Sequence, residues 1–169
     1  MSKVKRNRCS IKENIVEFRN YHFLRIDKFA YKQEITNKII IFLSYSTKDS
    51  HKFQIPQIAK GLESNPEIQK VYFWEVDMTG DMYEYMERNI KGSDYFLLFC
   101  SKNASNSIPV KKEWKAALTL KKKIIPVFDH PINIPLLITN RGIQFKGDDL
   151  EHIINSILKL ILKKGSLWC

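Results

Sequence analysis

From residue 38 onward, the pattern of apolar and polar positions predicts strands and helices in alternation. Short apolar runs bounded by polar loops are typical of strands in a sheet that is covered on both faces. These runs predict strands at Ile39–Tyr45, Lys70–Trp74, Asp94–Cys100, Lys123–Phe128 and, as a short fifth, Gly142–Phe145. Polar loops are expected at Glu75–Asp81 and at Ser101–Ser107, which is rich in turn residues.

Apolar residues at helical spacing predict helices that end near Glu63, span about Met82–Lys91 and Val110–Lys121, and run from Leu150 to Ile161. Their expected buried residues are Ile55, Ile58, Ala59 and Leu62, then Met82, Tyr85, Met86 and Ile90, then Val110, Trp114, Ala117 and Leu118, and last Leu150, Ile153, Ile154, Ile157, Leu158 and Ile161. Pro56 is expected in a first helical turn, and Gly92 is expected to close the second helix. Asp148 or Asp149 is expected to cap the last helix, and Gly165 to stop it.

Strands that alternate with helices of about 10–15 residues predict an α/β fold with one central five-stranded parallel sheet and helices on both faces. A chain of 169 residues is long enough for one domain with a proper core. We assign that domain to residues 37–169. Residues 1–36 form a basic, aromatic N-terminal extension, too apolar to be simple disorder, that packs either on the domain or on a partner chain.

The net charge of +10 raises nucleic acid and anionic membranes as partners. Residues 1–36 hold nine Lys and Arg against four Asp and Glu, and the basic residues beyond them are mostly scattered lysines. This distribution argues against a dedicated binding face. We therefore expect neither nucleic acid nor a membrane as a partner.

Cysteines, histidines and glycines offer no recognisable metal or cofactor motif. Cys9, Cys100 and Cys169 are odd in number and widely spaced, which indicates free thiols in a reducing cytoplasm. The four histidines are dispersed, so no metal site is expected. The chain contains neither a Walker phosphate loop nor G-x-G-x-x-G, and it contains no apolar run near the roughly 20 residues that span a bilayer.

Polar residues follow the first predicted strand directly, from Ser44 to Asp49. Ligands of open α/β sheets bind at the carboxyl ends of the strands, so we expect a site here. Tyr45, Ser46 and Thr47 are candidate contacts. Helix capping and turn formation explain this loop equally well, especially Ser46 and Asp49.

Glu113 lies at the edge of the apolar face of its predicted helix. A carboxylate in that position must be neutralised, hydrogen-bonded or used in chemistry. The alternative is a surface glutamate that pairs with one of the neighbouring lysines, Lys111, Lys112 or Lys115.

Two segments resemble the Toll/interleukin-1 receptor (TIR) domain family. The sequence IFLSYSTKDS, which ends at Ser50, resembles the family opening F-I/L-S-Y-x-x-x-D. Ser101 to Glu113 resembles S-x-x-S-x-W-V-x-x-E, and the sequence IIPV that follows resembles the family strand after that helix. Pro109 stands where the family has tryptophan, and Trp114 lies about 100° away from Glu113 around the helix. The resemblance covers residues 38–162.

The resemblance implies a flavodoxin-like TIR fold, as in microbial stand-alone TIR proteins. It implies one of two functions. The first is an enzyme that cleaves the nicotinamide–ribose bond of NAD+, as a substrate rather than a cofactor, in defence or cell-death signalling. The second is a non-catalytic module that assembles with other TIR domains, and a homo-oligomer is expected in either case.

For the enzyme, the resemblance makes Glu113 the catalytic carboxylate. The loop Glu75–Asp81 would gate the site and contact a neighbouring TIR domain, and Glu75 would line the cleft. Trp74 is either a packing residue or a platform for a nucleobase, in place of the family tryptophan.

Overall fold

The computed structural model describes residues 38–77, 80–138, 140–147 and 149–162. All of them lie in one compact unit, Ile35–Cys169. Within the described residues, no helix is long and apolar enough to cross a membrane.

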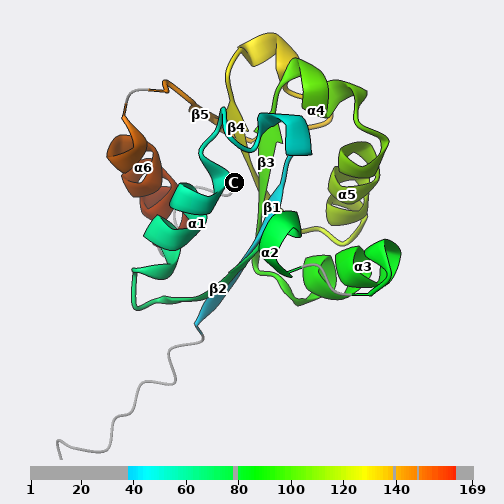
Figure 1. Cartoon of the computed structure of the whole chain (residues 1–169), viewed down its shortest axis with the longest axis horizontal. Helices are drawn as coiled ribbons and strands as arrows, with labels where there is room; N and C mark the ends of the chain where they lie inside the picture. Colours follow the sequence, from blue (N-terminus) through cyan, green and yellow to red (C-terminus); the bar gives the residue numbers. More distant parts are fainter. Residues whose placement is uncertain (1–37, 78–79, 139, 148, 163–169) are drawn as a thin grey trace, which may run out of the picture. The chain divides into compact units, whose positions relative to one another are not determined.

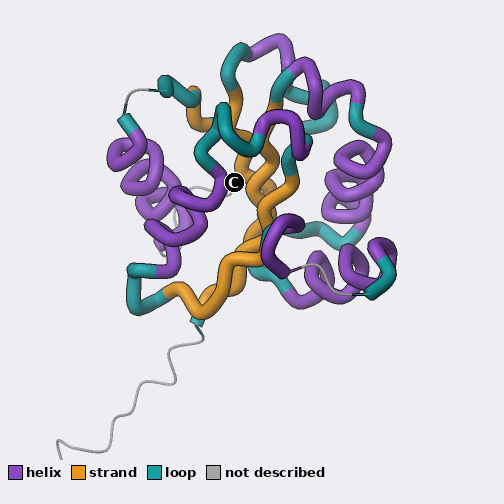
Figure 2. The backbone as a smooth tube through the Cα atoms, in the orientation of Figure 1, coloured by secondary structure: helices purple, strands orange, loops and turns teal. Residues whose placement is uncertain are grey.

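Five strands form one sheet at the centre of this unit (Figures 1 and 2). They are β1 (Ile39–Ser44), β2 (Ile68–Tyr72), β3 (Tyr95–Cys100), β4 (Lys123–Phe128) and β5 (Ile143–Gln144). The strand order is β2-β1-β3-β4-β5, and every neighbouring pair is parallel. The predicted fold class is therefore confirmed.

Helices cover both faces of the sheet (Figure 1). One face carries α1 (Ile55–Glu63) and α6 (Leu150–Leu162), and the other carries α3 (Met82–Gly92) and α5 (Ile108–Thr119). Shorter helices lie in the connections: η1 (Thr47–Asp49), α2 (Trp74–Asp77), α4 (Lys102–Asn106) and η2 (Pro131–Asn133).

The capping and core positions predicted for the outer helices are largely confirmed. All four residues predicted for the buried face of α1 are buried, and Pro56 lies in its first turn. Asp149 caps α6, because its Oδ1 accepts a hydrogen bond of 2.8 Å from the backbone N–H of His152. Asp148 and Gly165 lie outside the described residues.

The structure differs from the sequence-based prediction at several boundaries of strands and helices. Strand β2 begins and ends two residues earlier than expected. The short helix α2, which starts at Trp74, occupies the first part of the predicted loop Glu75–Asp81. The predicted loop Ser101–Ser107 contains α4, which the Ser101 hydroxyl caps by accepting a hydrogen bond from the N–H of Ala104. Gly92 is the last residue of α3 and does not follow it.

Helix α5 begins at Ile108, two residues before the predicted start. Pro109 fits the first turn of this helix, where its missing N–H leaves no hydrogen bond unmade. The buried residues of α5 are Val110, Glu113, Trp114 and Ala117, so the predicted apolar face is confirmed except at the half-buried Leu118.

The two faces of the sheet form two separate apolar cores. Successive side chains of a strand point to opposite faces. In β1, Ile41 and Leu43 join the core under α1 and α6, whereas Phe42 joins the core under α3 and α5. Ser44 continues the second series, and it therefore faces α5.

Replacement of Trp114 by alanine should destabilise the protein by about 3–5 kcal/mol, as for other buried aromatic residues. Trp114 is only 9% exposed and packs in the core under α3 and α5. Urea denaturation measures the loss, and Lys111→Ala on the exposed side of the same helix is the matched control. A loss below about 1 kcal/mol would show that Trp114 is not a core residue.

Candidate active site

Glu113 is a buried carboxylate at the carboxyl end of β1. It is 9% exposed, and the Ser44 hydroxyl, 1% exposed, donates a hydrogen bond of 2.5 Å to its Oε2. The sequence prediction placed Glu113 at the edge of the apolar face of its helix. The structure turns it further inward, between Val110 and Ala117 on the buried side of α5.

Burial disfavours the charged form of Glu113 and raises its pKa to about 7, from an ordinary value of 4.5. The hydrogen bond from Ser44 acts in the opposite direction, because it stabilises the carboxylate. Glu113 therefore holds a proton in mildly acidic solution and loses it near neutral pH. A titratable group of this kind, buried at the carboxyl edge of a parallel sheet, is a candidate for catalysis.

A second buried carboxylate fixes the loop that follows β1. Asp49 is 3% exposed and accepts hydrogen bonds of 2.5 Å from Ser101 Oγ and 2.7 Å from Asn103 Nδ2. Asp49 lies in η1, whereas Ser101 and Asn103 lie at the end of β3 and in α4. The loops after β1 and after β3 are thus tied together beside Glu113 and Ser44.

The structure does not bring Tyr45 together with Glu113. Tyr45 is 6% exposed and packs in the core under α1 and α6, on the opposite face of the sheet from α5. This follows from the alternation of side chains, since Tyr45 comes one residue after Ser44.

Ser46 and Thr47 lie where the sequence places them, in the loop after β1. Ser46 is buried and precedes η1, but its side chain makes no capping hydrogen bond. Thr47 is exposed and lines a pocket of about 600 Å³ together with residues of the same loop and the start of α1, among them Lys48, His51 and Lys52.

Trp74 and Glu75 lie in α2, which follows the carboxyl end of β2. Trp74 is half-buried, packs against the core under α1 and α6, and makes an edge-on contact with Tyr85 of α3, with ring centroids 6.4 Å apart. Glu75 accepts a hydrogen bond of 2.9 Å from Ser50 Oγ, which joins α2 to the loop after β1. Both residues thus border the same edge of the sheet as Ser44.

Sequence reasoning missed Ser44 as the partner of Glu113 and Asp49 as the anchor of its loop. The alternation of side chains along the first strand could have identified Ser44. It puts Ser44 on the face opposite Leu43, which is the face that α5 covers. The partners of Asp49 are 52 and 54 residues away, and no local pattern points to them.

Other features lie apart from this site. Within the described ranges, no three His, Cys, Asp or Glu side chains group as ligands of a metal ion would.

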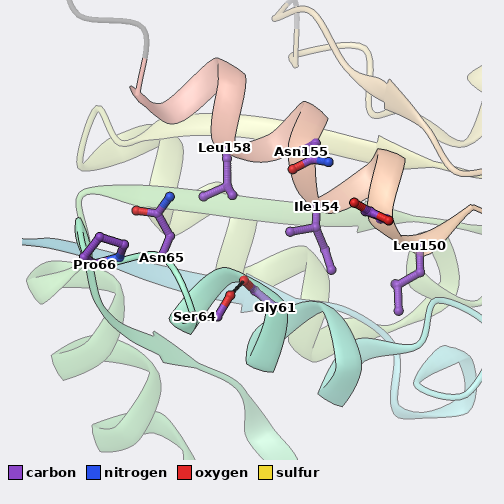
Figure 3. A pocket seen from close by; sticks show the side chains of 9 residues that line it. Gly61, Ser64, Asn65, Pro66, Leu150, Ile154, Asn155 and Leu158 are labelled. Atoms are coloured by element: carbon purple, nitrogen blue, oxygen red, sulfur yellow. Dashed lines mark hydrogen bonds between the residues drawn. The ribbon is translucent and has the colours of Figure 1, made fainter.

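A groove of about 550 Å³ between α1 and α6 lies on the face of the sheet opposite α5, where Ile154 and Leu158 point toward Gly61 and Ser64 (Figure 3). A Cβ atom on Gly61 would come within 2.3 Å of Ile154 Cδ1, so the two helices are closely packed there.

The chain is thus an α/β protein with a buried carboxylate, a candidate site, at the carboxyl edge of a parallel sheet. The sequence pattern of the TIR domain matches residues 41–158. The chain therefore belongs to the TIR domain family. No curated protein matches it.

Solved structures share this fold. The TIR domain of the Toll-related receptor TRR-2 from Hydra magnipapillata has a TM-score of 0.59 at 18% identity, over 72% of this chain and 95% of that one. A prokaryotic SEFIR domain has a TM-score of 0.57 at 19% identity, over 75% and 94%. The Clostridium botulinum CMP N-glycosidase BcmB has a TM-score of 0.54 at 22% identity, over 73% and 99%.

The free energy of unfolding should depend on pH through Glu113. Between the unfolded pKa of 4.5 and the native pKa of about 7, the native protein holds a proton that the unfolded chain has lost. The contribution of this proton is fully present below pH 4.5 and is lost as the pH rises through about 7. Wild type should therefore lose about 3 kcal/mol relative to Glu113→Gln between about pH 4 and pH 8.

Urea denaturation of both proteins across this range measures the difference. The amide that replaces the carboxyl group in Glu113→Gln does not titrate, so the variant cancels the pH dependence of all other groups. A difference in unfolding free energy that stays constant with pH would contradict a native Glu113 that holds its proton.

Proposed function

We propose that this protein is an NAD+ nucleosidase, which breaks the bond between nicotinamide and ribose and gives nicotinamide plus ADP-ribose or a cyclic isomer of it. The observation that carries the proposal is the buried pair of Glu113 and Ser44 at the carboxyl edge of the sheet. NAD+ is the substrate, and the reaction needs no further cofactor.

The chemistry suits one carboxylate. When the bond between ribose C1′ and the pyridinium nitrogen breaks, its electron pair goes to nitrogen, and nicotinamide leaves neutral without needing a proton. The ribose is left with positive charge shared between C1′ and the ring oxygen. A carboxylate in a water-poor site stabilises that charge more strongly than it would in water, and Glu113 is buried as this requires.

Ser44 holds the carboxylate for this task. Its hydroxyl donates to Oε2, which orients Glu113 and favours its charged form. We assign the other oxygen, Oε1, to the ribose. The cation formed at C1′ is then captured by water, which releases a proton and gives ADP-ribose, or by a nitrogen of the adenine ring, which gives a cyclic product.

The surrounding residues supply the rest of the proposed site. Ser46 and Thr47 lie in the loop that Asp49 anchors, and Trp74 and Glu75 border the same edge of the sheet. Trp74 is the candidate for stacking on a ring of NAD+, because it is only half-buried and also contacts Tyr85 of α3, whereas Tyr45 is buried in the core under α1 and α6. Base–aromatic stacking contributes on the order of 1–3 kcal/mol to binding.

The comparisons agree with this proposal at the level of family and fold. The chain belongs to the TIR domain family, and one structure with this fold is named as an N-glycosidase of CMP, so the fold accommodates cleavage of a glycosidic bond in that protein. By resemblance to the family, we propose that the protein acts in the cytoplasm, in defence or cell-death signalling, and that it forms a homo-oligomer on activation.

The proposal is tested by incubation of the concentrated full-length protein with NAD+ and chromatographic separation of the products. Wild type should release nicotinamide. Glu113→Gln should lower the rate on the order of 100- to 1000-fold, because the amide is nearly isosteric but cannot stabilise a cationic ribose. Glu67→Gln, an exposed glutamate in the connection before β2, is the matched control and should leave the rate unchanged.

Two results would contradict the proposal. Intact NAD+ after prolonged incubation at high protein concentration would favour the alternative, a non-catalytic module that acts by association with other TIR domains. A residual rate above about a tenth of wild type in a folded Glu113→Gln protein would remove Glu113 from the central role.

A further inference from the structure

The loop between β4 and β5 presents aliphatic side chains at the tips of two consecutive turns. Ile132 is 82% exposed, Leu136 is 97% exposed and Leu137 is 68% exposed. The N–H of Ile134 bonds to the carbonyl of Pro131, and the N–H of Ile138 bonds to the carbonyl of Pro135. Ile132 therefore lies at the centre of one turn, and Leu136 and Leu137 lie at the centre of the next.

These tip residues do not contribute to the core of the fold. The residues that close the two turns, Ile134 and Ile138, pack into the core under α3 and α5. The centres of turns usually carry Gly, Pro, Asn, Asp or Ser. The aliphatic residues at both tips thus expose apolar surface to solvent. Polar residues at these positions would remove that exposed apolar surface without weakening the core.

The charges of the domain are distributed unevenly about this loop. Residues 101–149, from the end of β3 to the end of the loop after β5, carry nine Lys and Arg against four Asp and Glu. Of those four acids, Glu113 is buried, Asp129 is paired with Lys52, and Asp149 caps α6. Residues 38–100 carry seven Lys and Arg against nine Asp and Glu. The stretch of sequence that contains the aliphatic tips therefore has a net charge of 9 − 4 = +5, whereas residues 38–100 have a net charge of 7 − 9 = −2.

We propose that the tip residues Ile132, Leu136 and Leu137 insert into the headgroup region of a membrane that contains anionic lipids. Exposed apolar tips within a basic stretch of the chain combine the two contributions that peripheral membrane binding uses, burial of apolar surface and attraction to anionic headgroups. Arg141 and Lys146 follow the tips in the chain and would contact the headgroups. This departs from the sequence-based expectation of no membrane partner, and it is independent of the proposed enzymatic function.

A lipid surface fits these observations better than a protein partner does. Protein interfaces bury a broad patch with aromatic and aliphatic residues at its centre. Here the aliphatic residues stand at turn tips with most of their surface exposed, a shape that suits insertion into a soft layer. The charge favours the same partner, since an anionic bilayer attracts a chain segment with a net positive charge.

Co-sedimentation of the full-length protein with vesicles tests the proposal. The probes are vesicles of phosphatidylcholine alone and of phosphatidylcholine with about 30% phosphatidylserine, an anionic content sufficient to create a negative surface potential. Wild type should sediment with the anionic vesicles only. Its binding should weaken as salt rises from about 0.1 to 0.5 M, because salt screens the attraction.

The variant L136S/L137S should weaken binding to anionic vesicles by at least about tenfold, from the loss of two inserted side chains. Leu120→Ser, an aliphatic residue 41% exposed at the end of α5, is the matched control and should bind as wild type does. R141Q/K146Q should weaken binding to anionic vesicles as well. Circular dichroism checks folding, and Leu136→Ser alone, at the most exposed position, replaces the double variant if the latter does not fold.

Three results would overturn the proposal. One is wild-type protein that does not bind anionic vesicles. Another is binding that a folded L136S/L137S or Leu136→Ser protein retains in full, which would assign it to charge alone or to other parts of the chain. The third is concentration-dependent self-association that L136S/L137S abolishes without any vesicle binding by wild type, which would assign the tips to a second copy of the chain.

Discussion

The hydrogen bond from Ser44 to Glu113 joins a strand and a helix through residues 69 positions apart, and the candidate site depends on it. It requires a strand whose alternation turns Ser44 toward α5, and a helix whose apolar face also carries a carboxylate. Burial of that carboxylate opposes folding, as the rise of its pKa to about 7 indicates. The apolar packing of Val110, Trp114 and Ala117 around it offsets this cost. Proteins accept such local conflicts mainly where function needs them.

Most of the fold was predictable from the sequence because each strand is an apolar run and each long helix has one apolar face. The start of α5 was harder to predict, since a proline such as Pro109 usually breaks a helix. It is compatible with a helix only in the first turn, where Pro109 lies. The orientation of Tyr45 was predicted wrongly, because the residue was treated as part of the loop. The alternation of side chains along the strand puts it in the core under α1 and α6. The contacts of Asp49 needed the tertiary structure, since they join loops that only the parallel sheet brings together.

The two proposals concern different parts of the same domain and have a joint consequence. Glu113 lies on the buried side of α5, while the aliphatic turn tips lie in the loop between β4 and β5. Confinement to a membrane surface raises the effective concentration of a protein and so promotes its association. A TIR domain that completes its site by assembly would then be most active where it is bound to lipid.

The dependence of kcat/KM on pH for NAD+ cleavage tests the central claim most directly, because it reports the ionisation of the essential group in the free enzyme. The account predicts that kcat/KM rises with pH through an apparent pKa of about 7, as Glu113 becomes a carboxylate. It also predicts that Ser44→Ala moves this apparent pKa upward, since the hydrogen bond that favours the charged form is lost. A profile with its midpoint near the ordinary value of 4.5, or one that Ser44→Ala leaves in place, would contradict the account.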